Sequence, residues 1–127
     1  MIEIALPVQQ VAELRARLTR EDRALIAKLP GTADLRVTDS VEAILTSVHQ
    51  TALELGIPEV QMDLRELELM NSSCFKSFVS WISEVSDLTA GQYRIRFLSN
   101  PGILWQRRSL HALSCFAAEL ITIEAGN

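Results

Sequence analysis

The sequence predicts a single α/β domain built on a mixed β-sheet, and three observations lead to this prediction. The chain has 127 residues, which is the size of one compact domain. Its composition, 48% hydrophobic and 22% charged, is that of an ordinary globular protein. From about residue 40 onward, segments of helical and strand periodicity alternate. Such alternation builds a sheet whose parallel neighbours are joined by right-handed crossovers.

The first helix is predicted over residues 41–55. Apolar residues recur there on one helical face: Val41, Ile44, Leu45, Val48, Ala52 and Leu55. Asp39 and Glu42 have the spacing of a capping pair, and Gly56 is typical of a helix end. Residues 60–64 alternate between apolar and polar side chains, which predicts a strand.

A second helix is predicted to begin near Asn71, because the next apolar residues follow helical spacing: Phe75, Phe78, Val79, Ile82 and Val85. Residues 93–97 alternate again and predict a second strand. Asn100 followed by Pro101 is typical of a helix cap with proline in the first turn. The helix that follows would contain Ile103, Leu104, Leu110 and Leu113, and residues 120–123 would form the last strand.

The N-terminal part of the chain fits two structures. Its apolar residues could lie along one helix: Val11, Leu14, Leu18, Leu25 and Leu29. Alternatively, residues 14–18 and 24–29 are the strands of a hairpin with its turn at residues 20–23. Periodicity does not choose between them. Residues 1–13 are expected to be an extension ahead of a domain at residues 14–127, as an extra strand, an arm, or the contact of a homodimer.

Charge and composition argue against several functional classes. With 12 basic and 16 acidic side chains the net charge is −4, which disfavours a nucleic-acid-binding protein. No apolar run is long enough to span a membrane. Glu3 stands where a signal peptide is positively charged, so a cytoplasmic location is expected. The only cysteines, Cys74 and Cys115, are expected to be reduced. No metal-ligand spacing or glycine-rich phosphate loop is present, and neither a metal nor a cofactor is expected.

Residues 60–75, which end in Asn71-Ser72-Ser73-Cys74-Phe75, resemble the signature of the STAS family, the bacterial anti-sigma-factor antagonists and their relatives. Members show a buried strand, an apolar pair and then Asp-Ser-Ser-Gly, or a variant of it, opening a helix. Residues 29–34 resemble the Gly-x-x-Asp turn of the family, and residues 110–123 its closing helix and strand. The resemblance implies a mixed sheet of about four to five strands packed with three to four α-helices. It also favours the hairpin for the N-terminal part.

In antagonists of this family, a partner serine kinase that is also an anti-sigma factor phosphorylates the second serine of the pair, and a phosphatase reverses this. By position that residue is Ser73, with Ser72 beside it. Asn71 stands where many members have Asp, and Cys74 where many have Gly. The resemblance therefore implies a non-enzymatic module that regulates transcription through its protein partners. Its expected partner-binding residues are Asn71, Ser72, Ser73, Cys74, Lys76 and Ser77.

A hydroxyl in the first turn of a helix faces unpaired backbone N–H groups and the positive end of the helix dipole. The domain itself would tolerate a phosphate there, whereas a partner shaped for a neutral hydroxyl would meet an added charge of about −1.5 to −2. Three alternatives remain open. The serines could only start the helix, the domain could be a constitutive subunit of a stressosome-type or lipid-transport-type assembly, or Cys74 could be a redox-sensitive thiolate.

Two further features are left open by the sequence. Four arginines form a basic cluster along the chain and are expected as solvated surface or as a steering patch for an acidic partner: Arg94, Arg96, Arg107 and Arg108. Trp81 is expected in the core because it shares a helical face with apolar residues. Trp105 lies among polar neighbours and is expected at a partner contact.

Overall fold

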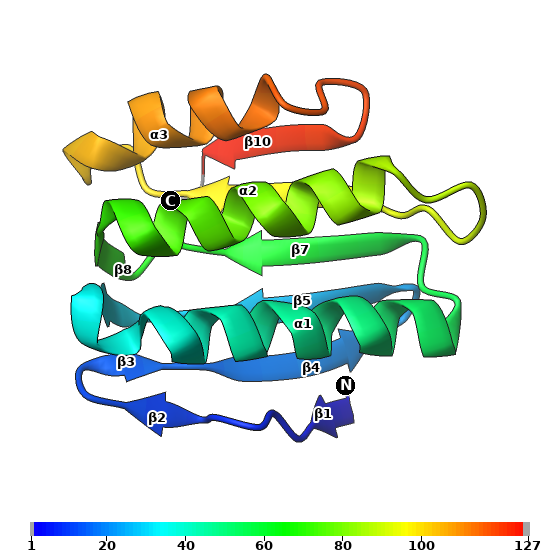
Figure 1. Cartoon of the computed structure of the whole chain (residues 1–127), viewed down its shortest axis with the longest axis horizontal. Helices are drawn as coiled ribbons and strands as arrows, with labels where there is room; N and C mark the ends of the chain where they lie inside the picture. Colours follow the sequence, from blue (N-terminus) through cyan, green and yellow to red (C-terminus); the bar gives the residue numbers. More distant parts are fainter. Residues whose placement is uncertain (1, 126–127) are drawn as a thin grey trace.

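A computed structural model describes residues 2–125, so the last two residues of the expected domain lie outside the described range. Within that range the main element is a six-stranded mixed sheet in the order β1-β4-β5-β7-β9-β10 (Figure 1). The predicted α/β class and mixed sheet are confirmed. The strands of this sheet are β1 (Ile2–Ile4), β4 (Arg17–Glu21), β5 (Ala24–Lys28), β7 (Glu59–Asp63), β9 (Arg94–Ser99) and β10 (Ile121–Ala125).

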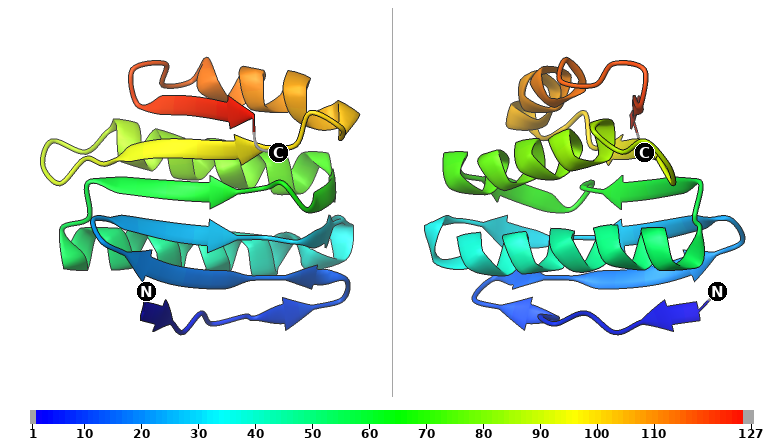
Figure 2. Two further views of the ribbon diagram at one scale, coloured as in Figure 1. Left: turned by 180° about the vertical axis from the view of Figure 1, so that it is seen from behind. Right: turned by 45° about the vertical axis from the view of Figure 1, so that its right-hand side comes forward.

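Three α-helices among the described residues connect the parallel strands. They are α1 (Thr38–Leu55), between β5 and β7, α2 (Ser72–Ser86), between β7 and β9, and α3 (Leu104–Ser114), between β9 and β10. Helices α1 and α2 cover one face of the sheet and α3 lies along β10, while the opposite face has no helix over it (Figure 2). The three predicted helices and the alternation of helix and strand are confirmed.

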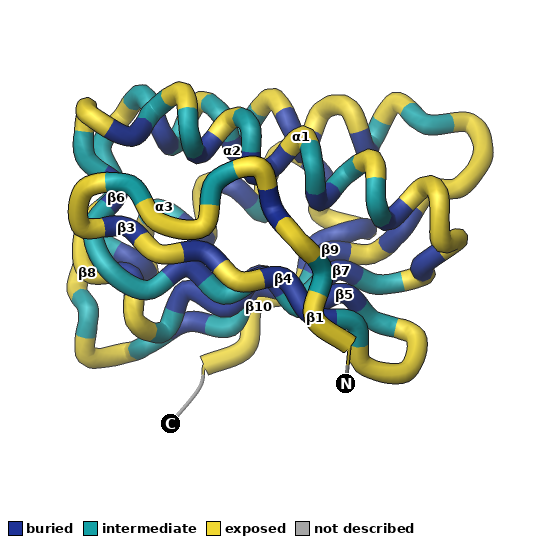
Figure 3. Tube along the Cα trace, turned by 90° about the horizontal axis from the view of Figure 1, so that it is seen from below, coloured by how far each residue is buried: buried dark blue, intermediate teal, exposed yellow. Residues whose placement is uncertain are grey.

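The core lies between the sheet and the helices, where the buried segments of both layers face one another (Figure 3). Most of the apolar residues predicted for the first two helices are buried there, and Trp81 joins them as expected. Leu55, predicted on the face of the first helix, is its last residue and is 42% exposed, while Phe75 and Val79 are partly buried. The helix-free face is mainly polar, with Gln61 and Arg96 side by side on neighbouring strands, as is usual for a sheet that is solvated on one side. On it, Arg96 lies between two carboxylates, 3.2 Å from Glu59 and 3.4 Å from Glu124.

The N-terminal part forms a hairpin, as the resemblance favoured, and not a helix. Its first strand runs over Arg17–Glu21 and not over residues 14–18, because Leu14 and Arg15 pair in a different sheet. Strands β4 and β5 pair antiparallel, and only Asp22 and Arg23 lie between them. Asp22 adopts a positive φ of 57°, a conformation that aspartate tolerates in a tight turn. Strand β1 pairs antiparallel with β4, so the sheet has six strands where four to five were expected. The division of the chain into an extension and a domain stays a prediction.

A second, smaller sheet lies at the end of the molecule where the helices begin. Its strands are β2 (Gln10–Val11), β3 (Leu14–Arg15), β6 (Gly31–Ala33) and β8 (Leu67–Met70), in the order β2-β3-β6-β8. Two of these strands continue strands of the large sheet: β6 follows β5 after Pro30, and β8 follows β7 after residues 64–66. Gly31 has a φ of 116°, and a Cβ atom there would overlap the backbone carbonyl of Glu13. Glycine is therefore required for the close approach of β3 and β6.

Two predicted helix starts are wrong. Helix α1 begins at Thr38 after a 3₁₀ turn over Leu35–Val37, and Asp34 caps that turn by accepting the N–H of Arg36 at 2.9 Å. The pair at residues 39 and 42 therefore lies inside the helix. Helix α3 begins at Leu104, because the Asn100 side chain accepts the N–H of Gly102 at 2.8 Å and closes a separate turn first. Leu104, expected on the apolar face, is consequently 90% exposed.

Candidate functional site

The candidate site is the first turn of α2, which follows β8 directly. The beginnings of all three helices and strand β8 lie at the same end of the molecule (Figure 1). Asn71 makes the transition from strand to helix. Its N–H donates to the Ala33 carbonyl of β6 at 2.9 Å, and its side-chain oxygen accepts the N–H of Cys74 at 3.0 Å. Asn71 is thus the N-cap, and the predicted start of the second helix is confirmed.

Ser72 and Ser73 are the first two residues of α2. Ser72 is exposed and Ser73 is half-buried. Their backbone N–H groups have no acceptor within the helix, because the first turn of a helix lacks preceding carbonyls. Lys76, one turn later, is exposed, and the Ser77 hydroxyl donates to the Ser73 carbonyl at 3.5 Å. The predicted serines, the lysine and the cap therefore lie together, at the surface or near it.

Cys74 differs from the other predicted site residues because its side chain is fully buried. Its sulfur lies 3.7 Å from the Asp34 carbonyl and 3.9 Å from the Thr38 hydroxyl, so it packs α2 against the start of α1. Burial raises the pKa of the thiol, and the contact with Thr38 opposes this only in part. The bulk of the cysteine points into the core and away from any partner. The thiol also lacks the exposure and the lowered pKa that a redox sensor needs.

A buried glutamine fixes the chain between β7 and β8. Gln106 of α3 donates from Nε2 to the Leu64 carbonyl at 2.6 Å and to the Leu67 carbonyl at 3.0 Å. Its Oε1 accepts the N–H of Asn100 at 2.8 Å. No solvent reaches this side chain. Because buried carbonyls need partners, the two hydrogen bonds to Leu64 and Leu67 anchor the segment that leads to Ser72, and the third ties Gln106 to the turn before α3.

Two neighbouring side chains complete this clamp, which we define as Asn100, Trp105 and Gln106. Asn100 donates from Nδ2 to the Arg65 carbonyl at 3.0 Å, and the Trp105 indole N–H donates to the Glu68 carbonyl at 2.8 Å. Trp105, expected at a partner contact, is thus half-buried and hydrogen-bonded within the fold. Sequence reasoning missed Gln106, since a glutamine next to Arg107 is typical of solvated helix surface.

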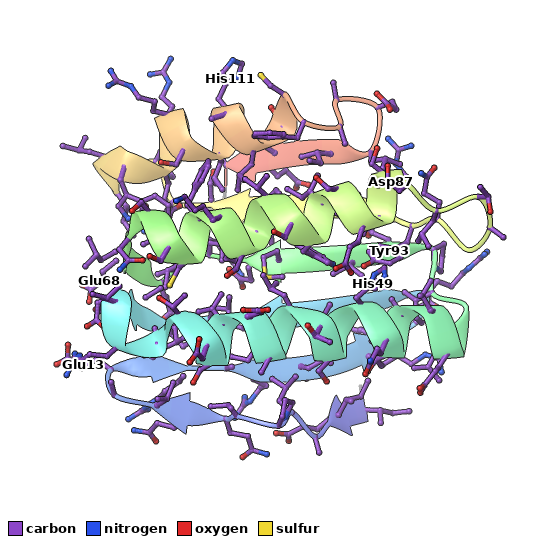
Figure 4. The ribbon with its side chains drawn as sticks, in the orientation of Figure 1. Glu13, His49, Glu68, Asp87, Tyr93 and His111 are labelled. Atoms are coloured by element: carbon purple, nitrogen blue, oxygen red, sulfur yellow. The ribbon has the colours of Figure 1, made fainter. Side chains whose placement is uncertain are left out.

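The surface beside the first turn of α2 is partly apolar. Leu35, in the 3₁₀ turn before α1, is 72% exposed, and Leu69 of β8 is 47% exposed. The Asp34 carboxylate binds Arg36 at 2.7 Å. Hydrogen bonds from the Arg36 side chain lower the pKa of Asp34 and keep it ionised. Glu68 lies at the same end of the molecule (Figure 4).

Asp63 lies at the carboxyl end of β7, just before the clamped segment. Its carboxylate accepts the backbone N–H of Arg65 at 3.1 Å and binds the Arg65 guanidinium at 2.9 and 2.8 Å. Burial opposes ionisation of this carboxyl group, but the hydrogen bonds from Arg65 outweigh it and hold the pKa of Asp63 below its usual value. The ion pair therefore also supports the bend between β7 and β8.

Among residues 2–125, no group of three or more His, Cys, Asp or Glu side chains is arranged to hold a metal ion. No helix in this range is long and apolar enough to cross a membrane.

Comparison with solved structures identifies the architecture. A crystal structure of an anti-sigma factor antagonist from Mycobacterium paratuberculosis superposes with a TM-score of 0.65 over 89% of this chain and 86% of that one, at 12% sequence identity. The chain has a STAS-type fold. The NMR structure of the protein TM1081 matches with a TM-score of 0.58, covering 85% of this chain and 78% of that one at 14% identity. No family model and no curated protein matches.

The predicted STAS-like fold is thereby confirmed, and at these identities the likeness concerns the fold. In this STAS-type domain the strand-to-helix junction at Asn71 lies where the sequence resemblance put it. The roles of Asn71, Ser72, Ser73, Lys76 and Ser77 stay predictions. The side chain of Cys74 faces the core and cannot touch a partner, so any contact of this residue with a partner would be made by its backbone.

We predict that one thiol per native chain reacts with a soluble thiol reagent, and that it is Cys115. Cys115 is exposed, whereas Cys74 is buried and its thiol pKa is raised. Intact-mass analysis after alkylation should show a single adduct, which Cys115→Ser abolishes, and a second adduct only in denaturant. Rapid labelling of Cys74 in the native protein would show that the core beneath α2 opens readily.

We also predict a pH-dependent contribution from Asp63. Its pKa is lower in the folded than in the unfolded chain, so ionised Asp63 stabilises the fold above the unfolded value of about 4, and this stabilisation is lost as the pH falls. The difference in unfolding free energy between the wild type and Asp63→Asn should therefore be largest near pH 7 and shrink below about pH 4. Urea denaturation at several pH values measures it. A difference that does not change with pH would contradict the prediction.

Proposed function

We propose that this domain is a regulatory protein-binding module, not an enzyme, and that its partner docks on the first turn of α2. Phosphorylation of Ser73, or of its neighbour Ser72, would then break the complex. The partner we propose is an anti-sigma factor or a similar serine kinase of the bacterial cytoplasm, opposed by a phosphatase. The observation that carries the proposal is the pair of serines at the helix start, one exposed and one half-buried, beside exposed apolar side chains.

The apolar neighbours supply a reason for docking at this place. Leu35 and Leu69 belong to the two segments that flank the first turn of α2, and the Asn71–Ala33 hydrogen bond joins these segments. Covering such side chains gives about 25 cal/mol for each Å² of apolar surface removed from water. A partner that covers both leucines would bring its own surface against Ser72. A neutral hydroxyl there would be tolerated, whereas a phosphate would be desolvated at high cost.

The domain itself is suited to accept the phosphate. The unpaired N–H groups and the dipole at the start of α2 favour a negative charge by about 0.3–1 kcal/mol. Lys76 lies four residues after Ser72 and three after Ser73, which places its ammonium group on the same side of the helix. Asn71 caps the helix through a neutral oxygen, so no carboxylate at the cap repels the phosphate. Modification is therefore expected to change binding and to leave the fold intact.

The alternative is a constitutive scaffold subunit that uses the same surface without modification. The residue that favours it is Asn71, in place of the aspartate found in many antagonists of the family. Cys74, which stands where many members of the family have Gly, does not favour the scaffold, because its bulk lies inside the core and not on the docking surface. The two functions differ in one respect that can be measured, which is the response of the complex to a negative charge at the helix start.

We predict that incubation with the partner kinase and Mg-ATP adds one phosphate, and that Ser73→Ala, alone or with Ser72→Ala, prevents it. Intact mass and peptide mapping measure this. In calorimetry with the same partner, Ser73→Asp should weaken binding about tenfold or more, while the neutral Ser73→Asn should not. Ser80→Asp is a matched control, because it adds the same charge at an exposed position two turns along α2.

Absence of phosphate uptake, together with equal binding by Ser73→Asp and Ser73→Asn, would contradict the switch. A stable complex under those conditions would establish the scaffold.

A further inference from the structure

Helix α3 presents an exposed stripe that the proposed function does not use. Arg107 and Arg108 lie three and four residues after Leu104, His111 lies four and three residues after the two arginines, and Cys115 lies four residues after His111. Residues at these spacings share one side of a helix. All five are exposed, whereas the opposite side of α3 is buried. His111 lies on the outer side of α3, turned away from the sheet (Figure 4).

The centre of this stripe is positively charged and unbalanced. Neither Arg107 nor Arg108 makes a salt bridge with any residue in the described range, and α3 contains no acidic residue. Arg96, which belongs to the same basic cluster in the sequence, is instead paired with carboxylates on the helix-free face of the sheet. The chain as a whole has a net charge of −4. The outer side of α3 is therefore a basic surface on an acidic protein.

Exposed apolar side chains lie at both ends of the charged stretch. Leu104 begins the helix and is 90% exposed, and Phe116, just past its end, is 55% exposed. The helix itself has 11 residues, which corresponds to a length of about 16 Å. Large apolar side chains with charged groups between them are typical of a surface that a partner covers.

We propose that this surface, which we call the α3 face, binds an acidic amphipathic helix of a partner protein. The α3 face consists of the exposed side of α3, with Leu104, Arg107, Arg108 and His111, together with Phe116 just past the end of the helix. Carboxylates in the middle of that helix would pair with the two guanidinium groups, which bind carboxylates through two parallel hydrogen bonds. Apolar residues three turns apart on the partner would cover Leu104 and Phe116. The proposal adds a second contact surface and does not rest on phosphorylation at α2.

An acidic protein segment fits this surface better than a membrane or a nucleic acid. Recognition of anionic lipid requires clusters of about four to eight basic residues, and the α3 face has two arginines and one histidine. A nucleic acid needs a broad basic surface as well, and the acidic remainder of this protein would repel it. Two arginines between apolar ends match the dimensions of a short amphipathic helix.

A displayed library of random peptides, about five helical turns long, tests the proposal without assuming a partner. The full wild-type chain is the bait. The double variant Arg107→Glu/Arg108→Glu is used for counter-selection, after circular dichroism has shown that this variant is folded. We expect enriched peptides with acidic residues in the middle and apolar residues about three turns apart. Enrichment of no peptide over the counter-selected variant, or of peptides without acidic residues, would overturn the proposal.

Fluorescence anisotropy with the most enriched peptide then tests the pairing. Arg107→Glu/Arg108→Glu should weaken binding about tenfold or more, and replacing the acidic residues of the peptide by lysine should restore it. Arg94→Glu is a matched single-charge control, since Arg94 is exposed at the start of β9 and belongs to a different element. Three results would overturn the proposal: an equal loss of binding in Arg94→Glu and Arg107→Glu, equal binding of the wild type and the double variant to the peptide, or stronger binding of the wild type to phosphatidylserine vesicles than to the peptide.

Discussion

A buried glutamine holds the part of the molecule on which the rest of this account depends. The chain bends between β7 and β8 and leaves the Leu64 and Leu67 carbonyls inside the protein, where an unpaired polar group costs about 1–3 kcal/mol. Gln106 supplies hydrogen bonds to both. With Asn100 and Trp105 it binds four carbonyls from the same short segment. The first turn of α2 is thus positioned by the core of the domain.

Two surfaces of different chemistry follow from this arrangement. The start of α2 presents neutral hydroxyls on a helix end that favours negative charge, so a single modification can change its electrostatic character while the fold stays the same. The outer side of α3 presents fixed positive charges between apolar ends. The clamp joins the start of α3 to the segment before α2, which places the two surfaces next to each other on one rigid frame. One partner could contact both, or two partners could bind separately.

Sequence periodicity predicted what depends on local pattern, and it failed where distant contacts decide. The apolar faces of α1 and α2 were predictable, since each helix buries one side against the sheet. Periodicity left the N-terminal part open between a helix and a hairpin, and only the family resemblance favoured the hairpin that β4 and β5 form. The start of α1 was not predictable in this way, because Asp34 caps a 3₁₀ turn that precedes the helix. The start of α3 was not predictable either, since the Asn100 side chain accepts the N–H of Gly102 in a turn and donates to the Arg65 carbonyl, 35 residues earlier. Gln106 gives no local signal at all, because its acceptors lie 42 and 39 residues away.

The central claim is that the first turn of α2 is held by the fold itself, and native-state hydrogen exchange tests it most directly. The amide of Leu67 donates to the Leu64 carbonyl, the amide of Asn71 to the Ala33 carbonyl of β6, and the amide of Cys74 to the side chain of the Asn71 cap. They should exchange with opening free energies close to those of β7 in the wild type. In Gln106→Met they should lose protection, while the Arg94 amide at the far end keeps it. Exchange of these amides near the unprotected rate in the wild type, or no effect of the substitution, would contradict the account.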